Sequence, residues 1–440
     1  MGGLYLKVSL KLWLMVAFSL AWMSLSLYLA LPWVRDLSVS LTLPGAWFVV
    51  TGLALIPGYA NAFLIGGLLF DWRPSFKRPE SLPPLTILIA AYNEQANIRE
   101  TLDSFHRQVY DGVLEILVID DGSVDQTAQY VLDYIATGQL NQGNTSLRLI
   151  RMPKNGGKAA ALNEGLSQAA HDYVATVDAD TLLFKDALNN IVSNQILSPA
   201  GTAATAGTVL VRNSRANFLT SLQEWDYFLG IAVVKRVQSL LQGTLVAQGA
   251  FSVYRKDVLN QVGGWPTTVG EDIVLTWAIL KRGYRVGYAE NAFVFTNVPT
   301  SYKAYYRQRK RWSRGLIEAF KHFPQILITP RLTLPFVFLN LLFPYLDFIY
   351  LFVFLPGVIA ALVFQNYLVV GLMTLLLIPL ALLLNMVMYF KQREVFREYG
   401  LQVRRNVVGA LSYMLMYQMV LAPASLMGYL SEILNARKTW

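Results

Sequence analysis

The chain has no cysteine, which excludes several kinds of site before any motif is considered. Disulfides, cysteine-ligated zinc, iron–sulfur clusters and a cysteine nucleophile all require that residue. Only three histidines occur, and His106, His171 and His322 lack the spacing of metal ligands. A histidine-based zinc site is therefore not expected. The sequence also contains neither a GxGxxG nor a Walker A motif, so it does not support a dinucleotide or ATP site.

Charged residues are scarce as well. They make up 15% of the chain, whereas about 25% is usual in soluble domains. Hydrophobic residues make up 54%, so much of the chain is predicted to be buried in a membrane. The net charge of +9 comes from basic residues beside the hydrophobic runs, a pattern typical of contact with anionic lipid. We therefore expect a lipid surface and not nucleic acid as a partner.

Several hydrophobic runs have the length of about 20 residues that a helix needs to cross a bilayer. The first could be a cleaved signal peptide, but its length and the run that follows favour an uncleaved anchor. The basic residues predict a cytoplasmic N-terminus and middle and an outside C-terminus, although Arg437 and Lys438 argue against the last point. The expected spans are Val8–Leu31, Ala46–Phe70, Leu334–Leu355, Tyr367–Phe390 and Val407–Leu430.

The hydrophilic middle, about Pro79–Pro324, alternates short apolar runs with helical patterns. This alternation predicts parallel βαβ units and an α/β sheet. Ligands of such sheets bind beyond the carboxyl ends of the strands. Strands are expected at Leu85–Ala91, Leu114–Asp120, Leu147–Met152 and Tyr173–Val177, and helices at Gln95–Gln108, Asp125–Ala136 and Gly157–Ala169.

Acidic residues follow these predicted strands. Asp178 and Asp180 flank Ala179, and two carboxylates on one side of a strand end can share Mg²⁺ or Mn²⁺. The alternative is a turn in which Asp180 caps a helix. Asp120 and Asp121 form a second acidic strand end, whose alternative is a turn before a capped helix.

A glycine-rich loop, Asn155-Gly156-Gly157-Lys158, precedes another predicted helix. Glycines allow the backbone to approach a ligand closely, and a helix N-terminus attracts anions. Lys158 adds a charge suited to phosphate. An ordinary glycine-rich loop is the alternative interpretation.

Two later motifs can act on an acceptor and a leaving group. Gly270-Glu271-Asp272 begins an apolar helical run and offers a general base, or else a helix cap. Gln308-Arg309-Lys310-Arg311-Trp312 lies in a basic aromatic stretch, which is also typical of an interfacial amphipathic helix. Its arginines can stabilise a departing diphosphate, and a sugar ring can stack on Trp312.

This ordered set resembles the inverting, membrane-embedded family 2 glycosyltransferases, which include cellulose, chitin, hyaluronan and poly-N-acetylglucosamine synthases. The resemblance covers about Pro84–Phe323 and also fits the arrangement of the spans. Within it, Trp225–Arg255 looks most like the bacterial poly-β-1,6-N-acetylglucosamine synthases. Gly270-Glu271-Asp272 departs from the family as a hybrid of its TED and GDD motifs, so the polymer is left open.

The resemblance implies a role for each candidate residue. Asp178 and Asp180 match the DxD metal motif, and the uridine-binding aspartate falls at Asp120 or Asp121. Asp272, with Glu271 beside it, matches the base, and Arg311 would stabilise the leaving group. The expected donor-binding residues are Tyr92, Asn93, Glu94, Asp120, Asp121, Lys158 and Asp178, and the expected acceptor-binding residues are Gln308, Arg309 and Trp312.

The implied activity is processive transfer from a UDP-sugar, with UDP-N-acetylglucosamine the favoured donor, onto a growing polysaccharide. The enzyme would use Mg²⁺ or Mn²⁺ and lie in the inner or plasma membrane with a cytoplasmic GT-A domain. A small membrane partner subunit is left open. The alternatives are a hyaluronan, chitin or glucan synthase, a transferase adding one sugar to a lipid carrier, and a transporter or scaffold with an inactive domain.

The same resemblance sets the expected domain organisation. A GT-A domain is inserted between transmembrane helices, with two helices before it and three after. The boundaries are 1–78 for two transmembrane helices, 79–300 for the GT-A domain, 301–330 for interfacial amphipathic helices and 331–440 for three transmembrane helices.

Overall fold

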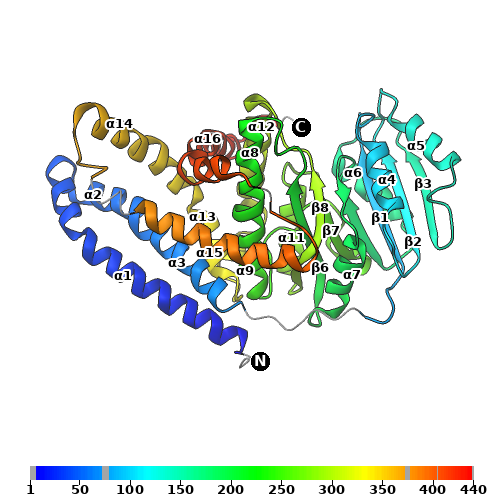
Figure 1. Ribbon diagram of the computed structural model, residues 1–440, viewed down its shortest axis with the longest axis horizontal. Helices are drawn as coiled ribbons and strands as arrows, with labels where there is room; N and C mark the ends of the chain where they lie inside the picture. The colour runs from blue at the N-terminus through cyan, green and yellow to red at the C-terminus, as the bar shows by residue number, and fades with distance from the viewer. Residues whose placement is uncertain (1–5, 72–78, 372–376, 404, 439–440) are drawn as a thin grey trace.

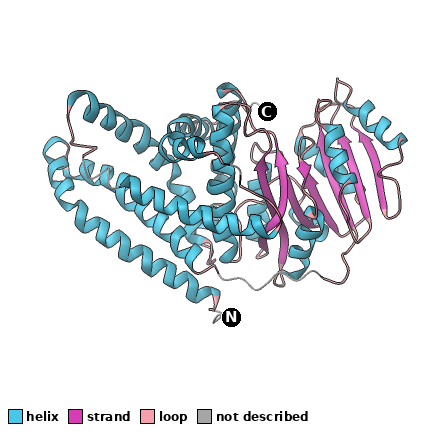
Figure 2. Cartoon of the chain, viewed as in Figure 1, coloured by secondary structure: helices cyan, strands magenta, loops and turns pink. Residues whose placement is uncertain are grey.

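The structure is a computed structural model that describes residues 6–71, 79–371, 377–403 and 405–438. Long helices from both ends of the chain gather in a bundle, and the middle of the chain forms a sheet beside it (Figure 1). The strands all lie on one side of this bundle (Figure 2).

The sheet has eight strands within the described residues, in the order β3-β2-β1-β4-β7-β6-β8-β5. The first four are parallel, whereas β7 runs antiparallel to both β4 and β6. The predicted α/β class is confirmed, and the antiparallel strands beyond β4 are an addition that the sequence did not predict. The bounds are β1 Leu85–Ala91, β2 Leu114–Asp120, β3 Thr145–Arg151, β4 Tyr173–Val177, β5 Leu182–Leu183, β6 Thr202–Val211, β7 Phe251–Arg255 and β8 Arg285–Thr296.

Both faces of β1, β2 and β4 are buried, which explains their largely apolar sequences, whereas the edge strand β3 is partly exposed. Side chains of a strand point alternately to its two faces. In β2, Leu117 and Ile119 join one hydrophobic core, and Ile116 and Val118 join the other. The helices of this region are α4 Ile98–His106, α5 Thr127–Ala136, α6 Lys158–Gln168, α7 Ala187–Leu197, α8 Phe218–Trp225, α9 Ala232–Leu240, α10 Lys256–Val262, α11 Glu271–Lys281 and α12 Tyr302–His322.

Four helices of the described residues are long and apolar enough to cross a membrane: Val8–Ser40, Leu43–Leu69, Leu334–Phe364 and Val407–Ile433. The predicted span Tyr367–Phe390 includes residues 372–376, which lie outside the described residues, so the number of crossings stays a prediction. The bounds are α1 Val8–Ser40, α2 Leu43–Val50, α3 Ile56–Leu69, α13 Leu334–Ile349, α14 Leu355–Phe364, α15 Leu377–Glu398 and α16 Val407–Ile433; short π-helical segments join α2 to α3 and α13 to α14.

Helix α16 lies beside α12 instead of running along the bundle. In Figure 1 it is seen nearly end-on, whereas α1, α3 and α15 run across the view. Its first turns contact α8, because Asn406 donates hydrogen bonds to Ser221 and Glu224. Near its other end, Glu432 pairs with Arg314 of α12. Both ends of α16 therefore contact helices of the sheet region, one end contacting α8 and the other α12.

The last described residues continue along α12. The backbone carbonyls of Ala436 and Arg437 accept hydrogen bonds from Arg314. Lys438 pairs with Glu318 of the same helix. The structure thus packs the C-terminal segment against α12, and the side of the membrane on which the C-terminus lies stays a prediction.

Candidate active site

The carboxyl ends of β1, β2 and β4 bring the predicted donor residues to one edge of the sheet. In the register of the parallel strands, Ala91 pairs with Asp120 and Leu88 with Thr176. Tyr92 directly follows β1, and Asp178 directly follows β4. The strand ends that the sequence analysis singled out therefore lie side by side, where α/β sheets bind ligands.

The loops after β1 and β2 hold each other in place. Asn93 has a left-handed backbone with φ of 56°. Its N–H donates to the hydroxyl of Ser123 at 3.0 Å, and its side-chain oxygen accepts from the N–H of Val124 at 3.0 Å. Asp125 accepts the N–H of Gln95 at 3.2 Å. The main contacts of Asn93 thus join the two loops to each other. The side chain of the neighbouring Tyr92 is exposed.

Asp120 is buried at the end of β2 and keeps one acceptor atom unused. Its Oδ1 accepts the N–H of Ser123 at 3.1 Å. Its Oδ2 lies 3.6 Å from the Arg151 Nε but makes no hydrogen bond with any described residue. A buried acceptor without a hydrogen bond is costly unless a ligand supplies a donor.

The side chain of Asp121, which follows β2, binds the backbone of the glycine-rich loop. Its two carboxylate oxygens accept the N–H groups of Gly156 at 2.7 Å and Gly157 at 2.8 Å. Gly157 has a φ of 86°, a conformation that favours glycine. The anion bound by this helix N-terminus is therefore a carboxylate of the protein itself, and the two amides do not face open space for a phosphate.

Lys158, the first residue of α6, joins the two acidic groups of the predicted site. Its ammonium forms an ion pair with Asp178. Although burial lowers the pKa of Lys158, the nearby carboxylates, chiefly that of Asp178, raise it above its ordinary value. Glu271 and Asp272 also contribute to that shift, so the structure brings the residues after β4 and the start of α11 together around one cation.

Asp178 and Asp180 lie in a turn after β4, not in the strand itself. The N–H of Thr181 donates to the Asp178 carbonyl at 3.0 Å. The next residues form β5, so the alternative in which Asp180 caps a helix is wrong. Burial, together with the charges of Asp178 and Glu94, raises the pKa of Asp180 to about 6.

This crowding of carboxylates fits a divalent cation, which would relieve their repulsion. Within the described residues, no group of three or more His, Asp or Glu side chains could hold a metal ion. Asp178 and Asp180, which both follow β4, are the residues that could hold such an ion, with substrate oxygens or water completing the coordination.

Glu271 and Asp272 form the first turn of α11, as the sequence predicted. Burial and the charge of Asp272 raise the pKa of Glu271 to about 7, although Lys158 and Arg311 oppose this shift. The Asp272 carboxylate accepts the N–H of Ile273 at 2.7 Å. A carboxylic acid with a pKa near neutrality, beside a second carboxylate, is suited to proton transfer.

Arg309 is buried on the inner face of α12. It forms an ion pair with Asp226 at 2.9 Å, and its guanidinium carbon lies 4.1 Å from the ring centroid of Trp312. Trp312 keeps 40% of its surface exposed. Arg311 is also exposed, and its positive charge lowers the pKa of Glu271, against the effect of burial. The motif on α12 thus borders the start of α11.

Three buried polar atoms of this motif make no hydrogen bond within the described part of the chain: the side-chain oxygen of Gln308 and the Nε and Nη2 atoms of Arg309. The Nη2 atom nevertheless lies 2.9 Å from Asp226 in their ion pair. The Gln308 oxygen is an acceptor that a ligand hydroxyl could satisfy.

Sequence analysis missed Asp226, Lys235 and Glu318 as parts of this site. Asp226 begins a π-helical segment, Asp226–Ile231, a feature frequent at functional sites. Lys235 donates to the carbonyl of Val246 at 3.0 Å, and burial lowers its pKa to about 7 although the charge of Asp272 opposes the shift. No periodicity in the sequence could have linked these residues to the site.

Comparison with known proteins agrees with this geometry. Residues 86–263 match the family described as Glycosyl transferase family 2. The resemblance seen in the motifs is confirmed. Over 237 residues the chain is 33% identical to poly-beta-1,6-N-acetyl-D-glucosamine synthase of Staphylococcus aureus (strain COL), a match that covers 54% of this chain and 55% of the relative. The synthase of Staphylococcus epidermidis is 33% identical over 232 residues, covering 52% and 54%. The match therefore spans about half the length of these curated relatives.

A solved structure supports the fold across most of the chain. Mannosyltransferase PcManGT from Pyrobaculum calidifontis, in complex with GDP-Man and Mn²⁺, is similar with a TM-score of 0.55 and 19% identity. The similarity covers 87% of this chain and 99% of that protein. At this identity the likeness concerns the fold alone.

Proposed function

We propose that the protein is a membrane-bound inverting glycosyltransferase that transfers a sugar from a UDP-sugar to a growing polysaccharide. The observation that carries this proposal is the convergence of Asp178, Glu271 and Asp272 around Lys158. The match to Glycosyl transferase family 2 supports the reaction class. The names of the curated relatives favour UDP-N-acetylglucosamine as the donor.

The donor would bind across the ends of β1, β2 and β4. Asp120 offers its unused carboxylate oxygen to a donor group of the uracil. Tyr92 and Glu94 border the same edge, and Asn93 holds the loop that carries them. Asp121 contributes by fixing the loop before Lys158.

Asp178 and Asp180 would hold Mg²⁺ or Mn²⁺ with the diphosphate of the donor. Such an ion neutralises the charge that develops on the leaving diphosphate. Lys158 keeps Asp178 in place through their ion pair. When the donor binds, the Lys158 ammonium would either stay with this carboxylate or move toward the diphosphate.

Asp272 would take the proton from the acceptor hydroxyl. The freed oxygen forms a bond to the anomeric carbon of the sugar, and the bond from that carbon to the diphosphate oxygen breaks, so UDP leaves with the electron pair. Arg311 would stabilise the departing negative charge. Glu271, with its pKa raised to about 7, is the second candidate for the base.

The acceptor would lie against α12. Trp312 offers its exposed face for stacking on a sugar ring, and Gln308 offers a side-chain oxygen to a hydroxyl. Arg309 is buried behind Trp312, so we propose that it holds the indole in place instead of contacting the sugar. The helices of the bundle would guide the polymer across an inner or plasma membrane, with the catalytic region cytoplasmic.

Turnover of a panel of nucleotide-sugars by the purified protein tests this proposal, with the products sized by mass spectrometry. We expect UDP release and long products from one UDP-sugar, with UDP-N-acetylglucosamine foremost. Transfer of a single sugar would contradict the proposal of a growing polymer. Turnover of a UDP-sugar other than UDP-N-acetylglucosamine would assign a hyaluronan or glucan type of polymer. Absence of nucleotide release with every donor would contradict the proposal as a whole.

A further inference from the structure

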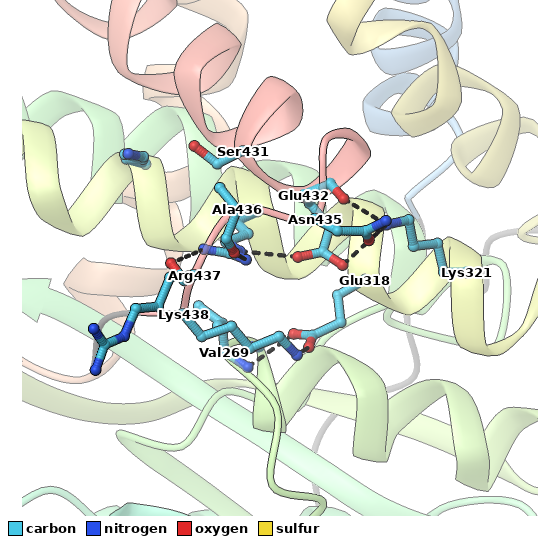
Figure 3. Close-up of polar contacts among 12 residues, drawn as sticks. Val269, Glu318, Lys321, Ser431, Glu432, Asn435, Ala436, Arg437 and Lys438 are labelled. Atoms are coloured by element: carbon cyan, nitrogen blue, oxygen red, sulfur yellow. Dashed lines mark hydrogen bonds and ion pairs between the residues drawn. The ribbon is translucent and has the colours of Figure 1, made fainter.

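A buried carboxylate connects the C-terminal segment to the loop that precedes Glu271 and Asp272. Glu318 of α12 is 1% exposed. Its Oε2 accepts the N–H of Val269 at 2.8 Å and that of Gly270 at 3.2 Å, and its other oxygen pairs with Lys438 (Figure 3).

The loop and α12 also touch backbone to backbone at this point. A Cβ atom on Gly270 would lie 2.6 Å from the Cα of Gly315. Only a glycine at each position allows this approach. The N-terminus of α11 is therefore fixed against α12 in two ways, by the close packing of Gly270 on Gly315 and by the carboxylate of Glu318.

The C-terminal segment, residues 432–438, is itself held at several points. Arg314 donates to the Glu432 carboxylate and to the carbonyls of Ala436 and Arg437. Lys321 donates to the side chain of Asn435 at 3.0 Å. These contacts lie beside Glu318, and Lys438 reaches its carboxylate, as Figure 3 shows.

We propose that Glu318 is a positioning residue for sugar transfer. We also propose that Lys438, at the end of the C-terminal segment, supports this role through its ion pair with Glu318. Resting on the proposed function, the inference is that Glu318 fixes the start of α11 so that Glu271 and Asp272 face the acceptor. Glu318 touches neither donor nor acceptor. Its two hydrogen bonds orient the backbone that carries the candidate base, and the charge of Lys438 balances its own.

The test compares Glu318→Ala, Glu318→Gln and Lys438→Met with a matched control, Glu115→Ala. Glu115 is also a buried carboxylate that accepts a backbone N–H, from Ala170 at 2.9 Å, and pairs with a basic side chain, Arg148 at 2.7 Å. It lies near the start of β2, at the opposite end of the strand from the candidate site.

We expect Glu318→Ala to lower kcat by roughly 10- to 100-fold, the effect of a small misplacement of a reacting group. The affinity for UDP should be unchanged, because the donor residues lie on other elements. Glu318→Gln retains an oxygen for the two N–H groups and loses only the charge, so its loss should be smaller and equal to that of Lys438→Met. The double variant Glu318→Gln/Lys438→Met should lose no more than either single variant.

Glu115→Ala should lower the melting temperature as much as Glu318→Ala but leave kcat per folded molecule unchanged. The same loss of kcat in both variants would overturn the proposal, since it would trace the effect to stability. Additive losses in the double variant would overturn the role of Lys438.

Hydrogen exchange at the amides of Val269 and Gly270 provides a readout that does not depend on activity. Exchange should become faster in Glu318→Ala and stay unchanged in Glu115→Ala. If the wild-type protein transfers no sugar, the proposed function fails while the exchange result still reports on Glu318. Unchanged exchange in Glu318→Ala would overturn the positioning role whatever the activity.

Discussion

At the scale of single residues, the acids at the start of α11 are the proposed groups for proton transfer. We expect Asp272→Asn to lower transfer by roughly 10²- to 10⁴-fold, the usual contribution of a general base. UDP affinity should stay the same, because this carboxylate would face the acceptor. Steady-state rates and equilibrium binding of UDP check both points. A collapse of UDP binding would indicate a structural helix start, and a larger loss in Glu271→Gln would assign the base to Glu271.

The raised pKa of Glu271 also predicts how stability changes with pH. The pKa is about 7 in the folded protein and near 4.5 for the ordinary group. Between these values the folded state binds more protons than the unfolded state, so stability falls as pH rises through this window and levels off above 7. Glu271→Gln removes that loss. The melting temperature of Glu271→Gln, relative to that of the wild type, should therefore rise between pH 5 and pH 8. A difference in melting temperature that does not change with pH would contradict the burial of this acid.

Sequence alone predicted most of the acidic residues but not how they are held. Asp178 and Asp180 were recognisable because acids at a strand end form a local pattern. The partner of Asp121 was not, because the hydrogen bonds from Gly156 and Gly157 cross from one strand end to another. Glu318 gave no signal for the same reason, since its contacts with residues 269 and 270 are long-range.

At the scale of elements, α12 carries the motif that is proposed to hold the acceptor. We expect Trp312→Ala to shorten the polymer while donor binding survives, because a flat contact with the acceptor is lost. Trp13→Ala is the matched control, since Trp13 of α1 is 68% exposed and lies on a membrane helix. Product length per molecule of inserted protein is the measurement. Native-length polymer from well-inserted Trp312→Ala would contradict the acceptor role.

Strands β1, β2 and β4 were predictable because strands buried on both faces have largely apolar sequences. Three of the four predicted strands have the observed bounds, and the third begins two residues earlier than expected and ends one residue earlier. The mixed half of the sheet, β5 to β8, was not predicted. β6 mixes Thr and Ala with Val and Leu over Thr202–Val211, so neither strand alternation nor a long apolar run marks it. The π-helical segment with Asp226 likewise has no local sequence signature.

At the scale of the whole molecule, the side of the membrane on which the C-terminus lies can be tested directly. The basic residues predict the outside, whereas the contacts of Arg437 and Lys438 with α12 favour the side of the sheet region. The chain has no cysteine, so single cysteines can report on each side. We expect Arg437→Cys and Asn144→Cys to react with an impermeant thiol reagent from the same side, and Asn366→Cys from the other. Labelling of position 437 together with position 366 would contradict this arrangement.

The central claim is metal-dependent transfer from a UDP-sugar, and UDP release by the purified protein tests it most directly. Wild-type protein with UDP-N-acetylglucosamine should release UDP when Mg²⁺ or Mn²⁺ is present and not when the metal is chelated. Asp178→Asn and Asp180→Asn should each abolish this release in a folded protein. Asp257→Asn, which alters an exposed acid paired with Arg255 at 2.6 Å, should leave it intact. Near-native release from either Asp178→Asn or Asp180→Asn would contradict the metal site, and no release by the wild type with any UDP-sugar would contradict the account itself.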